Sequence, residues 1–202
     1  MRPDVNTRIF ITGVGGQGSL TASRLLGEAA LSAGLPVTVS EVHGMSQRGG
    51  IVESCVLIGG AKSPLIGRGD ADLLVAFEPV EALRALSYCS AKTLAVVNTR
   101  PIVPFSVALG QAAYPSLEEM LSPLRNLVKR LVAFDATTLA EQAGSAMAIN
   151  AVLLGALAAT GTLPMAEDLV RRTVVSSVPA RIAASNERAF AAGIDVVKQQ
   201  TG

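Results

Sequence analysis

The sequence is poor in cysteine, and this shortage limits the metal chemistry that the chain can carry. Only two cysteines occur in 202 residues, Cys55 and Cys89, with no Cys-x-x-Cys pair and no histidine spaced for a zinc or iron–sulfur site. Two separated cysteines in apolar stretches are typical of buried, reduced thiols. If the protein belongs to a redox system, its metal centres therefore lie on another chain.

An excess of basic charge is also lacking. Seventeen Lys and Arg residues stand against sixteen Asp and Glu, which gives a formal net charge of +1. Nucleic-acid-binding surfaces need a clear basic excess. A nucleic-acid partner is therefore not expected.

The sequence has no long uninterrupted apolar run, and a signal peptide is not expected. Its first four residues have no apolar core of the kind that a signal peptide needs. The one candidate membrane segment, residues 146–163, is interrupted by Asn150, Gly155 and Gly161. A helix that is apolar on all sides is usually buried in a large core, so we expect a soluble, cytoplasmic protein without a membrane partner.

Aromatic residues make up only 3% of the chain and charged residues 16%, whereas half of the residues are hydrophobic. No shift in composition divides the chain, so residues 1–202 are expected to form one domain. A high content of small apolar residues indicates either a tightly packed core or a surface that a partner covers. Both interpretations remain open at this stage.

Short apolar runs alternate with amphipathic stretches along the whole chain. This alternation predicts an α/β fold of three αβα layers, with a largely parallel, Rossmann-like open sheet covered on both faces. The predicted strands are 9–12, 37–42, 51–58, 73–77, 93–97 and 130–134.

A glycine run follows the first predicted strand and precedes a predicted helix. Gly13-Val14-Gly15-Gly16-Gln17-Gly18 presents backbone N–H groups and a helix N-terminus, which is how a chain binds phosphate. The run satisfies Gly-x-Gly-x-x-Gly, and Glu41 near the end of the second strand stands roughly where a ribose-binding acid would lie. A stand-alone oxidoreductase that binds NAD(P) or a flavin nucleotide is therefore one hypothesis.

Two further patterns resemble enzyme motifs. Tyr88 and Lys92 have the Tyr-x-x-x-Lys spacing of short-chain dehydrogenases, but Lys92 directly precedes a predicted strand, so the two side chains are not expected to share a helix face. The glycine run followed by Ser19 also resembles adenylating enzymes, whose other catalytic elements cannot be assembled here. We interpret both matches as coincidences.

A second glycine-rich element, Gly44-Met45-Ser46-Gln47-Arg48-Gly49-Gly50, follows the second predicted strand. Loops at the carboxyl ends of parallel strands meet at one edge of a sheet, so this element should lie beside the first glycine loop. Together the two loops resemble the gamma-type domain of the 2-oxoacid:ferredoxin oxidoreductases, and the Ser-Gln-Arg-Gly-Gly form is most similar to the small subunit of the indolepyruvate branch. The similarity continues through Asp135-Ala136-Thr137 and 150–157 and covers about residues 7–195.

The resemblance implies a complex that oxidatively decarboxylates indolepyruvate or another aryl pyruvate to the acyl-coenzyme A. In such a complex thiamine diphosphate, Mg²⁺ and 4Fe-4S clusters lie on a large partner subunit, and ferredoxin accepts the electrons. This chain would be an accessory subunit that is inactive alone and binds none of these cofactors by itself. The isolated chain could form a homodimer through the surface that its partner should cover.

The resemblance assigns the two loops to an anionic ligand, the phosphates of the co-substrate coenzyme A, and assigns no catalytic or metal-binding residue to this chain. Gln17 would offer an amide and Arg48 a planar cation, although Gln17 could instead bond at the helix start and Arg48 could be a surface cation. His43 and Glu41 are given structural interpretations, as a lining residue and a strand-end cap. The residues of the predicted site are Gly13, Gly15, Gly16, Gln17, Gly18, Ser46, Gln47, Arg48, Gly49 and Gly50.

Overall fold

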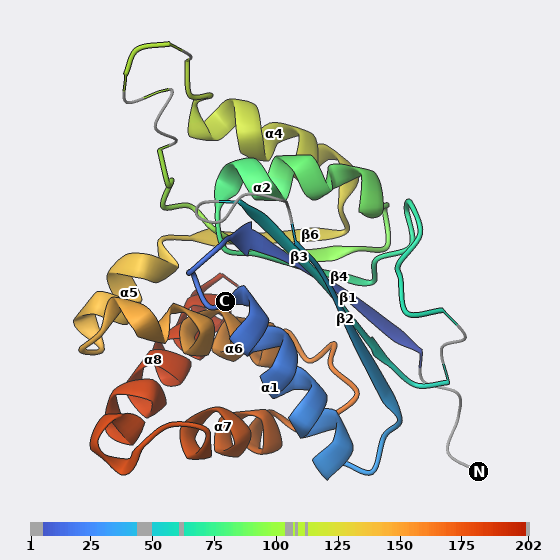
Figure 1. The fold of residues 1–202 in the computed structure, drawn as a ribbon, viewed down its shortest axis with the longest axis vertical. Helices are drawn as coiled ribbons and strands as arrows, with labels where there is room; N and C mark the ends of the chain where they lie inside the picture. Colours follow the sequence, from blue (N-terminus) through green and yellow to red (C-terminus); the bar gives the residue numbers. More distant parts are fainter. Residues whose placement is uncertain are drawn as a thin grey trace.

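One sheet of six strands runs through the middle of the protein (Figure 1). The computed structural model describes residues 6–43, 50–60, 63–103, 107, 109–111 and 113–200. Within these residues the strands lie in the order β2-β3-β1-β4-β5-β6. They are β1 (Thr7–Val14), β2 (Val37–His43), β3 (Ile51–Ile58), β4 (Leu73–Ala76), β5 (Leu94–Asn98) and β6 (Arg130–Phe134).

All of the strands except β3 run in the same direction. Strand β1 is parallel to β4, which is parallel to β5, and β5 to β6, whereas β3 is antiparallel to both of its neighbours, β1 and β2. A short connection joins β2 to β3, and short connections suit antiparallel pairs, whereas parallel neighbours need crossovers. The prediction of a largely parallel sheet with six strands is confirmed, and five strands end at the same edge.

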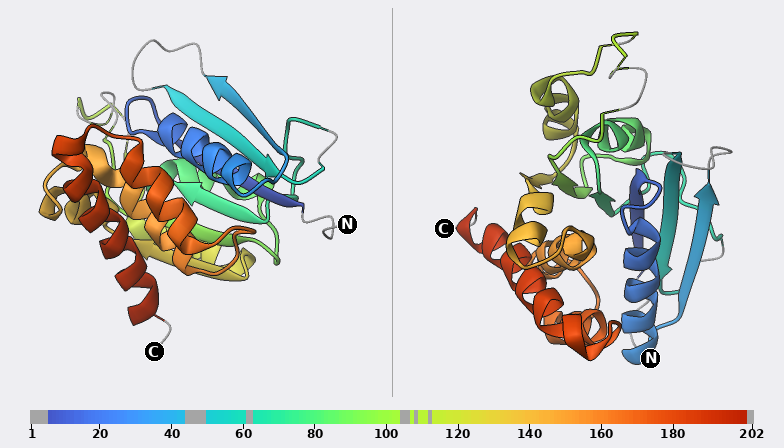
Figure 2. Two further views of the ribbon diagram at one scale, coloured as in Figure 1. Left: turned by 90° about the horizontal axis from the view of Figure 1, so that it is seen from below. Right: turned by 60° about the vertical axis from the view of Figure 1, so that its left-hand side comes forward.

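Within the part of the chain that the structure describes, five helices cover one face of the sheet (Figures 1 and 2). They bury an apolar core against β1, β4 and β5 that includes Ile9, Ile11, Leu26, Val75 and Val96. The helices are α1 (Ser19–Ser32), α5 (Ala136–Gln142), α6 (Ile149–Ala159), α7 (Glu167–Ser176) and α8 (Ala180–Gln199).

The opposite face is covered by fewer elements. Helix α2 (Pro79–Arg84), the 3-10 turn η1 (Ala85–Tyr88) and helix α4 (Leu117–Leu127) pack over it, as the upper part of Figure 1 shows. Their core contains Phe10, whose ring stacks on that of Tyr88 with the centroids 4.1 Å apart. The structure therefore has the three αβα layers that the alternation of patterns predicts.

Helix α6 is apolar on almost every side, and it is buried between other elements. It contacts α8 most closely through two glycines: a Cβ on Gly155 would lie 2.1 Å from the carbonyl oxygen of Phe190, and one on Gly193 would lie 2.0 Å from that of Val152. The segment considered above as a membrane span is thus a core helix. Within the described residues, no helix combines the length and the apolar character that crossing a bilayer requires.

Candidate functional site

The first glycine run forms the turn between β1 and α1, at the edge where five strands end. Gly16 and Gly18 have φ angles of 96° and 91°, in the left-handed region that a side chain disfavours. Gly13 is required for a different reason, because a Cβ there would lie 2.9 Å from the Cβ of Phe77. The three glycines thus allow a tight turn packed directly against the end of β4.

The side chain of Gln17 stabilises this turn through two hydrogen bonds. Its Oε1 accepts a hydrogen bond of 2.7 Å from the Val14 N–H, and its Nε2 donates one of 2.9 Å to the carbonyl oxygen of Phe77. These contacts agree with the interpretation of Gln17 as a residue that bonds at the helix start. They use one of the two amide hydrogens of Gln17, which leaves the other for a ligand. The side chain therefore shapes the loop, whatever else it binds.

The N-terminus of α1 opens at the same turn. Gly18 is the N-cap residue, no side chain caps the helix, and its first turn holds no acidic residue. Uncapped N–H groups and the helix dipole attract a negative charge there. The turn and the helix start therefore form a place where an anion would be stabilised.

The described end of the second glycine-rich element lies beside the first. The Gly15 N–H donates a hydrogen bond of 2.9 Å to the carbonyl oxygen of Gly50, and Val14 pairs with Ile51 across β1 and β3. The predicted proximity is confirmed for Gly50. The other predicted ligands in this element, Ser46, Gln47, Arg48 and Gly49, lie outside the described residues.

A buried amide, which sequence reasoning did not identify, joins the site to the next strands. Asn98 ends β5, and its Nδ2 donates to the carbonyl oxygen of Phe77, at 2.9 Å, and to Thr137 Oγ1. Its Oδ1 accepts from the N–H groups of Ala136 and Arg100. The sequence signal for this residue is a single polar side chain at the end of an apolar strand. Asn98 connects the ends of β4, β5 and β6 to the start of α5.

Asp135 and Arg100 extend this network at the start of α5. Asp135 accepts a hydrogen bond of 2.8 Å from the Thr138 N–H and one of 3.1 Å from Arg100 Nε. Partial burial by itself would raise the pKa of Asp135, but the bonds from Thr138 and the charge of Arg100 outweigh it and lower that pKa. The carboxylate caps α5, as its position in the sequence suggests.

Two buried carboxylates lie at the start of α2. Glu78 accepts hydrogen bonds from the N–H groups of Glu81 and Ile102 and from the Tyr114 hydroxyl. Burial and the bond to Glu78 raise the pKa of Tyr114. Burial also raises the pKa of Glu81, against the opposing charge of Arg84, and Glu81 Oε2 has no hydrogen-bond partner. Glu78 therefore holds the chain on both sides of the 102–114 segment.

The strand order argues against the dinucleotide hypothesis. In a dinucleotide-binding sheet the second strand pairs directly with the first, which brings its terminal acid to the ribose. Here β3 lies between β1 and β2, so Glu41 is one strand farther from the glycine loop. Glu41 instead lines a groove of about 570 Å³ between α1 and β2.

The Tyr88 and Lys92 pair is not a catalytic couple. Tyr88 stacks on Phe10, while Lys92 Nζ lies 3.9 Å from Asp70 and 3.8 Å from Asp72. Asp72 precedes β4, so Lys92 belongs to the edge opposite the glycine loop. The interpretation of this spacing as a coincidence agrees with these contacts.

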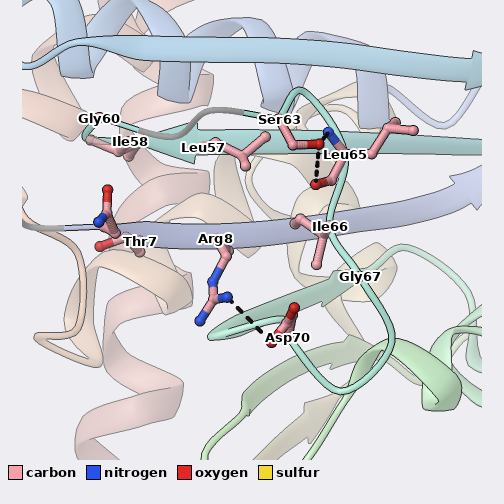
Figure 3. Close-up of a pocket in the computed structure, with 11 residues that line it drawn as sticks. Thr7, Arg8, Leu57, Ile58, Gly60, Ser63, Leu65, Ile66, Gly67 and Asp70 are labelled. Carbon is pink, nitrogen blue, oxygen red and sulfur yellow. Dashed lines mark hydrogen bonds and ion pairs between the residues drawn. The ribbon is translucent and has the colours of Figure 1, made fainter.

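A hollow of about 530 Å³ lies at that opposite edge (Figure 3). Its cation, Arg8, contacts Asp70 at 3.3 Å and Asp72 at 3.1 Å, so its charge is already compensated. Figure 3 shows the side chain of Arg8 turned toward Asp70. Among the described residues, no group of His, Cys, Asp or Glu side chains is arranged to hold a metal ion here or elsewhere.

Comparison with known proteins identifies the family. Residues 8–196 match the model of the pyruvate ferredoxin/flavodoxin oxidoreductase family. The indolepyruvate oxidoreductase subunit IorB of Thermococcus kodakarensis is 44% identical over 96% of this chain and 97% of its own length.

Solved structures share the fold. The gamma subunit of a keto/oxoacid ferredoxin oxidoreductase from Geobacter sulfurreducens aligns with a TM-score of 0.69 at 24% identity, over 96% of this chain and 99% of that one. The 2-oxoglutarate:ferredoxin oxidoreductase of Magnetococcus marinus, solved with 2-oxoglutarate, coenzyme A and succinyl-CoA, aligns with a TM-score of 0.72 at 21% identity, over 96% of this chain and 31% of that one. With the family match over nearly its whole length, the chain belongs to the pyruvate ferredoxin/flavodoxin oxidoreductase family.

Proposed function

We propose that this chain is the small accessory subunit of an indolepyruvate:ferredoxin oxidoreductase. The complex oxidatively decarboxylates indolepyruvate or another aryl pyruvate, transfers the acyl group to coenzyme A and reduces ferredoxin. The name of the 44% identical relative supports the substrate class. The structure of the Magnetococcus marinus enzyme, whose bound molecules include coenzyme A, supports the co-substrate.

The residues of this chain do not fit the redox cofactors of such a complex. Cys55 and Cys89 are both buried, and burial raises the pKa of the Cys89 thiol to about 11. A 4Fe-4S cluster needs four thiolate ligands, and this chain has two cysteines in all. We therefore assign the clusters to a large partner subunit. We place Mg²⁺ and thiamine diphosphate there as well, since the described residues hold no group of metal-ligating side chains, and the isolated chain is inactive.

The uncapped start of α1 carries the proposal for what this chain does. Its glycine turn is held by Gln17 and lies against Gly50, so the backbone N–H groups at the helix start keep a fixed direction. Such a start stabilises a phosphate through hydrogen bonds and the helix dipole. The chain binds and orients the phosphates of coenzyme A, and Arg48 in the second loop adds a cation.

The test begins with the complex. The tagged chain is purified from its native cells, and the eluate is assayed for coenzyme A-dependent reduction of a viologen dye by indolepyruvate. Co-purification of a large iron–sulfur subunit with this activity supports the proposal. A chain that purifies alone and binds NAD would contradict it and would favour the dinucleotide-binding oxidoreductase.

The role of the glycine turn is tested in the same complex by Gly16→Ala, with Gly34→Ala as the matched control. Both glycines have positive φ angles and open space around the missing Cβ, but Gly34 lies at the far end of α1. Alanine keeps the backbone N–H but disfavours the positive φ of Gly16, so the turn must shift and a helix-start N–H loses its direction toward the ligand. Losing one hydrogen bond to a charged ligand in this way costs about 1.5–3 kcal/mol, so Gly16→Ala should raise the KM for coenzyme A about tenfold or more. Equal effects of the two substitutions would show that backbone strain alone is responsible.

A further inference from the structure

Asn150 is the one polar residue among the apolar side chains of α6. The first ten residues of this helix, 149–158, are buried, and only 8% of the surface of Asn150 is exposed. A buried carboxamide that lacks hydrogen-bond partners costs about 1–3 kcal/mol. Its position in an otherwise apolar helix therefore needs an explanation.

One hydrogen bond fixes the orientation of this side chain. The Ala151 N–H donates to Asn150 Oδ1 at 2.8 Å, which identifies the oxygen and turns Nδ2 away from that N–H. Among the described residues, no acceptor is found for Nδ2. Three side-chain atoms of the described residues are both fully enclosed and without a hydrogen-bond partner. Asn150 Nδ2 also lacks a partner but is not among these three, so it is not fully enclosed and reaches accessible space.

The space beside Asn150 is the start of α1. A Cβ on Gly18 would lie 3.8 Å from the Cβ of Asn150 and 4.0 Å from its Cγ. Gly18 is the N-cap residue of α1, and no side chain caps that helix. An unpartnered amide donor therefore lies next to the N–H groups that favour an anion.

We propose that Asn150 Nδ2 donates a hydrogen bond to the anionic group held at the start of α1. The acceptor is a phosphate oxygen, which can receive N–H groups from the helix start and from the side chain together. This inference rests on the proposed function, because it takes the ligand at the glycine turn to be a phosphate of coenzyme A. Asn150 is then a binding residue contributed from α6, more than 130 positions after the glycine run.

A purely structural role for Asn150 makes a different prediction. At the start of α6 the side-chain oxygen accepts from a backbone N–H, and a carboxylate would do the same and interact favourably with the helix dipole. Asn150→Asp therefore keeps the size and the acceptor, removes the donor and adds a negative charge that repels phosphate. Asn150→Ala removes the donor without adding charge, and serves if the aspartate prevents folding.

The experiment measures coenzyme A binding by titration calorimetry on the purified complex. Asn150→Asp should raise the Kd for coenzyme A at least tenfold and Asn150→Ala severalfold, with a raised KM for coenzyme A and an unchanged KM for indolepyruvate. The control is Asn186→Asp, because Asn186 on α8 is buried to almost the same extent as Asn150, at 7% exposed. The Kd of the Asn186→Asp complex for coenzyme A should stay within twofold of the wild-type value. Melting temperatures show whether each variant is folded.

The outcomes separate the two proposals. A wild-type complex that binds coenzyme A, with the same Kd in folded Asn150→Asp or Asn150→Ala, would overturn the role of Asn150 and leave the proposed function standing. A wild-type complex that turns over indolepyruvate but shows no coenzyme A binding would overturn both the assignment of the ligand and the inference. Equal weakening by Asn186→Asp would overturn the inference by tracing the effect to a buried charge.

Discussion

The close contact between α6 and α8 gives a sharp test of the packing. We expect Gly155→Ala to destabilise the protein, although alanine is the better helix former by about 1 kcal/mol. The new Cβ would lie 2.1 Å from the carbonyl oxygen of Phe190, whereas ordinary contacts begin at 3.4 Å, so the helices must separate by more than 1 Å. The obstacle is a backbone atom, which cannot turn aside as a side chain can.

The expected magnitude follows from two opposing terms. Overpacking a core costs about 1–3 kcal/mol and sometimes more, and separating two helices also loses contacts along their length. After subtracting the gain in helix propensity, Gly155→Ala should lower the free energy of unfolding by about 2 kcal/mol. For a chain of this length that corresponds to a fall in Tm of about 4–8 °C.

Gly27→Ala in α1 is the matched control. Its Cβ would lie 3.0 Å from Cγ2 of Val39, a methyl group on the edge strand β2 that can rotate away. This variant should be as stable as the wild type or slightly more stable. Urea unfolding followed by far-ultraviolet circular dichroism measures the stability of both variants. A Gly155→Ala protein no less stable than Gly27→Ala would show that the α6–α8 contact tolerates a Cβ.

Two further predictions concern the buried acids at the start of α2. Tyr114→Phe removes the hydroxyl that donates to Glu78, which should lower the free energy of unfolding by about 1.5–3 kcal/mol. Proteolysis between residues 102 and 114 should then become faster, and an unchanged rate of cleavage would contradict this prediction. Burial raises the pKa of Glu81 in the folded state, so the wild type loses stability as pH rises from the unfolded value of about 4.3 through that raised pKa. Glu81→Gln does not ionise, so its stability relative to the wild type should increase between pH 4 and pH 7.5 in urea unfolding, and a constant difference would show that Glu81 does not titrate there.

Local patterns predict the strands of this chain well. Every predicted strand is present within two residues of its observed ends, because most are short apolar runs bounded by glycine or polar residues, a pattern that is read from the local sequence. The apolar segment before Gly161 is the core helix that its interruptions suggest. Pro123 is an exception to the local rules, since α4 continues past it to Leu127.

The order of the strands is less visible in the sequence. Nothing in residues 51–58 reveals that β3 inserts between β1 and β2, since strand neighbours depend on contacts between distant segments. That insertion removes Glu41 from the glycine loop. Asn98 is missed as a component of the site for the same reason, because its partners Phe77 and Ala136 are far away in the chain. The nearness of Asn150 to Gly18 is equally invisible in the sequence.

The carbonyl oxygen of Phe77 receives hydrogen bonds from both Gln17 and Asn98. This shared acceptor joins the glycine turn to the ends of β4 and β5 and, through Asn98, to the start of α5. Glycine-rich segments ordinarily lose much conformational entropy when they become ordered. Here the ordering is completed when the chain folds, so the turn is pre-organised and the proposed ligand would not have to rigidify it.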